Sequence, residues 1–448
     1  MDHFNYFSND WFGDFEVKIM KKKINFFLNK KILIYGLGKS GLASYNFLKD
    51  RNEVYFYDDF KLGIKLSKIT NRQIEYKKIY DYNFDIIIIS PGIDIIKCQL
   101  SQFLRKNKNK IITDLDVFYK SNPHNICFAI TGSNGKSTTC KILHNVLYDQ
   151  KFDARLVGNI GNPILAEKNI NKSTVFVVEA SSYQLEYSKY FRSKYSVILN
   201  ISPDHLERHK TFSKYFSIKC KIFTSLVSNG RGFVFISKKY EKLLTLNLKK
   251  LKLKNKIKKI NKFLNITINN NYLNNKNFNS SLNICNQILK KLKISNHIIA
   301  KGLSQFKSLP HRQQIVRKIK NISFINDSKA TNFDSANFSI NCFKNIFWIV
   351  GGQMKQGDNF HLNKLRHKII KAYIIGKSCS VFEKKIKKYV KYVIANNLNK
   401  ALKLAFKDAT QQNINESVIL LSPAAASFDQ FKNFKHRGEV FTKLAKEI

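Results

Sequence analysis

The chain has 448 residues and a formal net charge of +47, with 78 lysines and arginines against 31 acidic residues. This length exceeds what one hydrophobic core usually supports, so we expect two or three domains. The seven cysteines include no Cys-x-x-Cys pair, which argues against a disulfide framework or a zinc site. No apolar run reaches the roughly 18 residues that span a bilayer, and we expect a soluble, cytoplasmic protein.

The positive charge comes mainly from lysine, which is spread along the chain among many asparagines and isoleucines. A strongly basic protein often binds nucleic acid or an anionic membrane. The even spread, without an RNA-binding or zinc-finger pattern, instead favours the composition of an AT-rich genome. We therefore expect no specific nucleic-acid partner and no membrane span. A basic, nucleotide-dependent RNA-binding protein stays open as an alternative from another class.

The first regular pattern covers residues 31–112 and follows an apparent extension at 1–30. Apolar runs at 32–35 and 54–57 predict two strands, joined through Gly36-Leu-Gly-Lys-Ser-Gly41 and a helical pattern. Such a turn places backbone N–H groups and a helix N-terminus against phosphate, as a UDP group requires. Close helix packing, or a nicotinamide cofactor in a dehydrogenase, would give the same pattern.

A stronger phosphate-binding pattern lies at Ile130-Thr-Gly-Ser-Asn-Gly-Lys-Ser-Thr-Thr139, between a strand-like run and a helical pattern. Its glycines let backbone N–H groups approach phosphate oxygens, while Lys136 and the Ser137 hydroxyl are placed for phosphate and Mg²⁺. The loop is short, because only two residues separate Gly132 from Gly135. This pattern predicts a central ATP-binding domain.

Polar side chains follow two further predicted strands of the central domain. Glu179 follows the strand at 175–178, and His205 follows the strand at 197–199. Because the carboxyl ends of parallel strands share one edge, we expect Glu179 as a Mg²⁺ ligand and His205 as a ligand at a second metal site. Taken alone, either residue would more simply be a structural hydrogen bonder.

The last third of the chain repeats the α/β alternation. Apolar runs at 322–325, 346–350, 372–375 and 418–421 predict strands that each end in polar or glycine residues. Three consecutive α/β units with loops at their strand ends indicate a site built between domains.

Several motifs together resemble the Mur ligase family: Gly132–Thr138, Gly158–Gly161, Glu179–Gln184, Asn200–His205, Leu309–Arg312 and Asn326–Thr331. Residues 422–434 resemble the member that adds D-glutamate, and the Asp-Asn-Pro-Arg motif of the diaminopimelate-adding member is absent. The resemblance implies an α/β protein with a Rossmann-like N-terminal domain (1–112), a central P-loop ATPase-type domain (113–308) and a Rossmann-like C-terminal domain (309–448). We expect a monomer.

The resemblance also implies a ligase of peptidoglycan precursor synthesis that requires ATP and Mg²⁺. ATP phosphorylates the terminal carboxylate of UDP-N-acetylmuramoyl-L-alanine, and the amine of D-glutamate attacks the resulting acyl phosphate. Each step brings negatively charged groups together or develops negative charge, so we expect cationic groups to line the site. A sister ligase that adds another amino acid is the nearest alternative.

Site residues follow from the same resemblance. Lys219 matches a carbamylated lysine, whose amine captures CO₂ and becomes anionic, so the implied catalytic and metal-binding set is Lys136, Ser137, Glu179, His205 and Lys219. For ATP the resemblance implies Gly132, Ser133, Asn134, Gly135, Lys136, Ser137, Thr138, Asn286, Arg312, Asp327 and Lys329. For the UDP-linked substrate it implies Lys39, Ser40, Asp59, Gly92, Asn159, Ser182 and Gln184. For D-glutamate it implies Thr331, Lys355, Ser427, Phe428 and Phe434.

Overall fold

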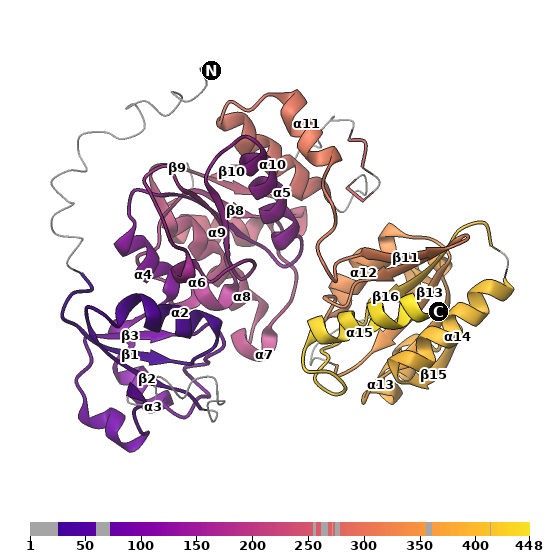
Figure 1. The fold of residues 1–448 in the computed structure, drawn as a ribbon, viewed down its shortest axis with the longest axis horizontal. Coiled ribbons are helices and arrows are strands. Elements are labelled where there is room, and N and C mark those ends of the chain that lie inside the picture. The colour runs from indigo at the N-terminus through magenta and orange to yellow at the C-terminus, as the bar shows by residue number, and fades with distance from the viewer. Residues whose placement is uncertain are drawn as a thin grey trace. The chain divides into compact units, whose positions relative to one another are not determined.

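The computed structural model describes residues 26–59, 72–253, 257–260, 268–270, 272–273, 278–354, 361–412 and 414–448. Three sheets occur within these ranges, and helices pack against them (Figure 1). The predicted α/β fold class is confirmed. By internal contacts the chain forms two compact units, one made of residues 1–132, 139–201 and 213–261, the other of residues 133–138, 202–212 and 262–448. Each predicted domain contains one sheet, while the boundaries at 112 and 308 stay predictions.

The first sheet is parallel and has the order β2-β1-β3-β4. Its strands are β1 (Lys31–Tyr35), β2 (Glu53–Tyr57), β3 (Ile86–Ile89) and β4 (Ile111–Ile112). The main helices of this part are α2 (Lys39–Leu48) and α3 (Ser101–Lys106). Strands buried on both faces read as continuous apolar runs, which is why the run at 32–35 predicted β1.

The glycine turn between β1 and α2 is closely packed. Gly36 has a φ of +91°, and a Cβ added to Gly41 would lie 1.9 Å from the Gly36 carbonyl oxygen. The Ser90 hydroxyl donates a hydrogen bond of 2.6 Å to that same carbonyl oxygen. Glycine is therefore required here by the path of the backbone itself.

The central sheet has the order β10-β9-β8-β5-β7-β6, and all its strand pairs are parallel. Its strands are β5 (Ile126–Thr131), β6 (Ala154–Gly158), β7 (Val175–Glu179), β8 (Ser193–Ile198), β9 (Leu226–Val234) and β10 (Ile257–Lys259). The helices of this stretch of chain are α4 (Asp114–Ser121), α5 (Lys136–Asp149), α6 (Ser182–Tyr187), α7 (Leu206–His209), α8 (Phe212–Cys220), α9 (Glu241–Lys250), α10 (Asn279–Lys291) and α11 (Asn296–Ser304). The loop between β5 and α5 carries the predicted phosphate-binding residues.

The C-terminal sheet has the order β11-β12-β16-β13-β14-β15 and is parallel except for the antiparallel β11–β12 pair. Its strands are β11 (Gln314–Ile319), β12 (Ile322–Asn326), β13 (Ile346–Gly351), β14 (Ile369–Ile375), β15 (Tyr392–Asn396) and β16 (Ser417–Leu421). One face packs on α12 (Phe333–Cys342) and α13 (Cys379–Ile386), and the other on α14 (Leu398–Gln411) and α15 (Phe434–Glu447). The four predicted strands are confirmed. The two edge strands, β11 and β15, were not predicted.

No helix within the described ranges is long and apolar enough to cross a membrane.

Candidate active site

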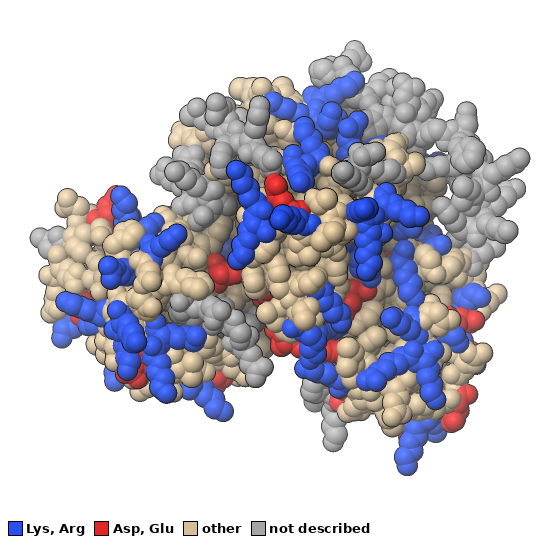
Figure 2. All heavy atoms as spheres, turned by 180° about the vertical axis from the view of Figure 1, so that it is seen from behind, with Lys and Arg blue, Asp and Glu red and all other residues tan. Residues whose placement is uncertain are grey.

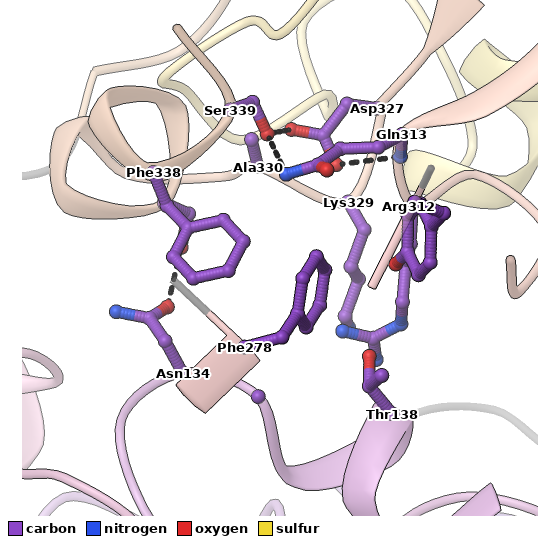
Figure 3. Close-up of a pocket in the computed structure, with 13 residues that line it drawn as sticks. Asn134, Thr138, Phe278, Arg312, Gln313, Asp327, Lys329, Ala330, Phe338 and Ser339 are labelled. Carbon is purple, nitrogen blue, oxygen red and sulfur yellow. Dashed lines mark hydrogen bonds between the residues drawn. The ribbon is translucent and has the colours of Figure 1, made fainter. Parts of the chain in front are cut away.

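A pocket lies within the second compact unit, beside the loop that follows β5 (Figure 3). Six of the residues predicted for ATP line it together: Asn134, Gly135, Thr138, Arg312, Asp327 and Lys329. Seven lining residues were not predicted: Tyr272, Phe278, Gln313, Ala330, Ser335, Phe338 and Ser339. Figure 3 shows Arg312 and Lys329 extending from the upper wall toward Thr138, so two cations face the start of α5.

The phosphate loop has the backbone geometry that its glycines predict. Gly132 and Gly135 have φ values of +157° and +79°. The Lys136 amine donates to the Ser133 carbonyl oxygen at 2.8 Å, and it stands at the first position of α5. Ser137, the next residue, is 1% exposed. The N–H groups at this helix start face the position where a phosphate binds in such loops.

Arg312 donates a hydrogen bond of 2.6 Å from Nη2 to the Ser137 hydroxyl. Its two neighbours, His311 and Gln313, have φ values of 60° and 48°, which are unusual for residues other than glycine. Hydrogen bonds hold this loop: the Gln314 side chain accepts from the His311 N–H at 3.0 Å. Backbone strain held by surrounding contacts is typical of functional positions, and here it presents Arg312 to the phosphate loop.

The carboxyl group of Asp327 is buried among hydrogen-bond donors at the far wall of the pocket. Oδ2 accepts from the hydroxyls of Ser339 at 2.5 Å and Ser422 at 2.9 Å, and Oδ1 accepts from the Gln313 N–H at 3.3 Å. Burial raises the pKa of Asp327 to about 7, although these donors and the Arg312 guanidinium oppose the shift. Loss of hydration therefore outweighs the hydrogen bonds.

Glu179 and Lys219 lie at the carboxyl edge of the central sheet, within the first unit. Ile130 of β5 pairs with Glu179 of β7, so the glutamate stands level with the end of the strand that enters the phosphate loop. Glu179 is 1% exposed, and its Oε1 accepts from the Asn159 side chain at 2.7 Å. The buried Lys219 amine donates to the Gly132 carbonyl oxygen at 2.9 Å and lies 4.8 Å from the Tyr215 ring centroid. The structure thus brings the predicted Glu179, Asn159 and Lys219 to one edge.

No group of three or more His, Cys, Asp and Glu side chains able to hold a metal ion occurs in the described part of the chain. Mg²⁺ needs no such cage, because it usually binds one or two carboxylates together with water and substrate phosphates. A buried carboxylate at Glu179 and a buried hydroxyl at Ser137 are oxygen ligands of the kind that this ion takes.

His205 begins the turn before α7 with a left-handed φ of 55°. Its Nε2 lies 3.2 Å from Asp204 Oδ2, and its Nδ1 lies 3.5 Å from Glu207 Oε1. Asp204 Oδ1 in turn accepts from the Asn332 side chain at 3.1 Å, and Asn332 caps α12 directly after Thr331. These contacts lie within the second unit. They connect the predicted His205, through Asp204 and Asn332, to the residue that follows the predicted Thr331.

The residues predicted for the UDP-linked substrate lie in the first unit. Lys39 and Ser40 begin α2. Asp59 accepts from the Tyr35 hydroxyl at 2.6 Å, whereas Asp58 accepts from the Leu37 N–H within the glycine turn, also at 2.6 Å. The carboxylate that fixes the turn is therefore that of Asp58, which is not in the set implied for the UDP-linked substrate. Gly92 follows β3, and a Cβ added there would meet no atom within 4 Å.

Gln184 is buried in the first turn of α6, where Ser182 is the first helical residue. Its Oε1 accepts from the Ser181 backbone N–H at 3.1 Å and from the Ser181 hydroxyl, which closes a capping box. Gln184 thus stabilises the start of α6. A contact with the substrate would be a second role of the same side chain.

Of the residues predicted for D-glutamate, Ser427 and Phe428 lie in the segment that leads to α15, and Phe434 begins this helix. The Lys329 amine lies 3.9 Å from the centroid of the Phe434 ring. Ser427 is buried, whereas Phe428 is 71% exposed. Lys355 lies outside the described residues. A further residue, Arg437, joins these segments by donating to the carbonyl oxygens of Ser328 and Ala425 at 2.9 and 3.0 Å.

Asn286, predicted at the adenine, is buried inside α10 and is not part of the pocket wall. The residue that this region contributes is Phe278, which precedes α10 and lies with its ring 5.3 Å from that of Phe338. Phe278 and Asn286 stand eight positions apart in the chain, and the placement of the adenine at Asn286 stays a prediction.

Comparisons with known proteins agree with the motifs. Residues 130–304 match the model of the Mur ligase middle domain. UDP-N-acetylmuramoylalanine–D-glutamate ligase of Rickettsia felis is 35% identical, over 94% of this chain and 98% of that protein. The ligase of the same name from Bartonella henselae is 32% identical, over 95% and 99%.

Solved structures are similar in fold. UDP-N-acetylmuramate-alanine ligase from Thermotoga maritima aligns with a TM-score of 0.56 and 16% identity, over 94% of this chain and all of that one. The predicted resemblance is confirmed along nearly the whole chain, so this protein belongs to the UDP-N-acetylmuramoylalanine–D-glutamate ligases of the Mur ligase family.

Proposed function

We propose that this protein joins D-glutamate to UDP-N-acetylmuramoyl-L-alanine and hydrolyses ATP to ADP and phosphate in doing so. The observation that carries the proposal is the identity of 35% to a ligase of that name over nearly the full length of both chains. The reaction belongs to peptidoglycan precursor synthesis. We propose that the reaction takes place in the cytoplasm and that the protein is a monomer. The seven free thiols suit a reducing compartment.

ATP binds in the pocket beside the phosphate loop. Lys136 and the N–H groups at the start of α5 hold phosphate oxygens, while Arg312 and Lys329 add positive charge from the opposite wall. The Asp327 carboxylate accepts hydrogen bonds from ribose hydroxyls. Stacking between the aromatic side chains Tyr272, Phe278 and Phe338 suits a planar base.

Ser137 and Glu179 would hold Mg²⁺, which supplies positive charge to the transferring phosphoryl group. His205 would serve a second metal position through one ring nitrogen, while the other nitrogen stays beside Asp204 or Glu207. Lys219 would react with CO₂ as a neutral amine, forming a carbamate N–C bond and releasing a proton. The Lys219 side chain would then be an anion instead of a cation beside the phosphate loop.

The two organic substrates take their contacts from residues that follow the carboxyl ends of strands. Lys39, Ser40 and Gly92 bind the UDP group, and Asn159, Ser182 and Gln184 lie toward the peptide end. D-Glutamate takes its carboxylate contacts from Lys355, Thr331 and Ser427, and from the neighbourhood of Phe428 and Phe434. Cations and N–H donors gathered in this way stabilise the charge that develops when the amine attacks the acyl phosphate.

The test is release of ADP and phosphate with ATP, Mg²⁺ and UDP-N-acetylmuramoyl-L-alanine, with D-glutamate, L-glutamate, D-alanine, L-lysine or no amino acid. We expect turnover with D-glutamate alone, and none in the matched variant Lys136→Ala. Turnover with another amine would keep the ligase class and change the substrate. Silence throughout from folded protein, together with RNA binding at low salt, would favour the nucleic-acid alternative.

A further inference from the structure

His311 directly precedes Arg312, and the proposed function gives the His311 side chain no role. The imidazole ring packs against α15 at Gly438, where an added Cβ would lie 2.2 Å from His311 Nδ1. The same Nδ1 lies 3.1 Å from the side-chain nitrogen of Asn326, the last residue of β12. The ring is therefore held between β12 and α15, by close packing on one side and a hydrogen bond on the other.

The contacts of Asn326 decide which of the two side chains donates this hydrogen bond. Asn326 is buried, and its Oδ1 accepts from the Ser328 N–H at 3.2 Å. Its Nδ2 donates to the Gly438 carbonyl oxygen at 2.8 Å and to the Thr442 hydroxyl at 3.0 Å. The atom that faces His311 is therefore the amide nitrogen, which can only donate. It follows that His311 Nδ1 accepts, as it does in a neutral ring that carries its hydrogen on Nε2.

The backbone of His311 leads to both cations of the nucleotide pocket. Arg312 is the next residue in the chain, and it donates to the Ser137 hydroxyl of the phosphate loop. The Lys329 N–H donates to the His311 carbonyl oxygen at 3.1 Å. Both Arg312 and Lys329 line the pocket, whereas His311 is not among its lining residues. A shift of the His311 backbone would therefore displace two cations that face the nucleotide.

We propose that His311 is a positioning residue for nucleotide binding: its ring, by accepting the Asn326 hydrogen bond, fixes the loop that presents Arg312 and Lys329 to the phosphates. This inference rests on the proposed function. His311 has a left-handed φ of 60°, a conformation that costs free energy in a residue with a side chain. The hydrogen bond and the packing on Gly438 offset this cost, so the loop keeps its shape before any nucleotide arrives.

The first test measures the affinities for ADP and for UDP by calorimetry on the full chain. His311→Gly permits the left-handed backbone but removes the acceptor that faces Asn326. We expect this variant to bind ADP about tenfold more weakly, as for the loss of a buried hydrogen bond, and to bind UDP as the wild type does. His311→Asn should keep the wild-type affinity for ADP, because its Oδ1 can replace Nδ1 and asparagine tolerates a positive φ.

The matched control is His436→Gly, which removes another imidazole from the same region. His436 Nδ1 accepts from the Lys432 N–H at 3.3 Å, and the residue lies in the first turn of α15. This variant should lower the melting temperature and keep the wild-type affinity for ADP. An unchanged ADP affinity in His311→Gly, equal losses in His311→Gly and His311→Asn, or an equal loss for UDP would each overturn the proposal.

Steady-state kinetics separate positioning of the nucleotide from general damage. In His311→Gly we expect a raised KM for ATP and an unchanged KM for UDP-N-acetylmuramoyl-L-alanine, measured by phosphate release. Equal changes in the two KM values would overturn the proposal. A wild-type protein that binds neither ADP nor UDP would instead overturn the proposed function itself.

A last measurement uses the wild type and so does not depend on the folding of a variant. Nitrogen-15 NMR of protein labelled at histidine reports which ring nitrogen carries the hydrogen. The His311 signals, assigned by their loss in His311→Asn, should show a bare Nδ1 and a protonated Nε2. A hydrogen on Nδ1 would overturn the proposal, since the ring could not then accept from Asn326.

Discussion

The Asp327 carboxyl group makes nucleotide binding sensitive to pH. With a pKa of about 7, it holds a proton in acidic solution and cannot then accept two ribose hydroxyls. We therefore expect ADP affinity to rise with pH through 5 to 7.5 and ADP binding to release protons in that range. Calorimetry in buffers of different ionisation enthalpy would measure the released protons. Asp327→Asn should flatten the profile, and a steep profile in that variant would assign the effect to another group.

The same group affects stability in the opposite direction. Because the pKa in the folded state is raised from 3.8, the folded protein binds more protons than the unfolded chain between about pH 4 and 7. The contribution of Asp327 to the free energy of unfolding therefore falls as the pH rises through this window. Thermal melts of the wild type and Asp327→Asn across the window should converge at its acidic end.

Lys219 offers a second prediction at the scale of one residue. If its carbamate is the active form, Lys219→Ala should be nearly inactive and should regain part of its activity with acetate or formate, which replace the missing carboxylate. The initial rate of phosphate release measures both effects. The wild type should also lose activity in CO₂-depleted buffer and recover it with bicarbonate. Full activity of Lys219→Ala without additives would remove the carbamate from the mechanism.

At the scale of elements, the turn between β1 and α2 tolerates no side chain at Gly41. The nearest atom to an added Cβ is backbone, at 1.9 Å, so the helix would have to shift. We expect Gly41→Ala to cost about 1–3 kcal/mol of stability and to weaken UDP binding while leaving ADP binding intact. Gly92→Ala is the stability control, since its Cβ meets nothing within 4 Å. Equal melting temperatures for the two variants would contradict this packing argument.

The sequence predicted those elements whose apolar runs are long and buried. Strands β13 and β16 are examples, because buried parallel strands need no alternation. It missed β11, which mixes apolar and basic residues without a regular alternation and whose residues are only partly buried or exposed. Its pairing with β12 is decided by tertiary contacts. It also gave no sign of Phe278 in the pocket wall, because this residue is one of several aromatic residues with no fixed motif. The placement of the adenine at Asn286 stays a prediction.

At the scale of the whole molecule, the charge imbalance is the dominant surface property. Figure 2 shows lysine and arginine side chains scattered over the visible face with few acidic neighbours. Since 78 basic residues face 31 acidic ones, most surface cations have no acid with which to pair. Mutual repulsion then opposes the compact state, and salt relieves it.

This imbalance predicts an unusual salt response. The melting temperature should rise between about 10 mM and 150 mM sodium chloride, where the screening length shortens to about 8 Å. Scanning calorimetry in chloride, repeated at matched ionic strength with a second salt, separates screening from ion-specific effects. A melting temperature that falls with added salt would mean that ion pairs outweigh repulsion in the folded protein.

The bond between Arg312 and the Ser137 hydroxyl has a consequence for the order in which ligands arrive. Without a nucleotide, Mg²⁺ would have to bind the Ser137 hydroxyl while Arg312 donates a hydrogen bond to it. The Arg312 guanidinium repels the ion. Nucleotide phosphates bring the negative charge that can draw Arg312 away and free this oxygen. We therefore expect the nucleotide-free protein to bind no free Mg²⁺ at this position. The metal should bind only together with a nucleotide.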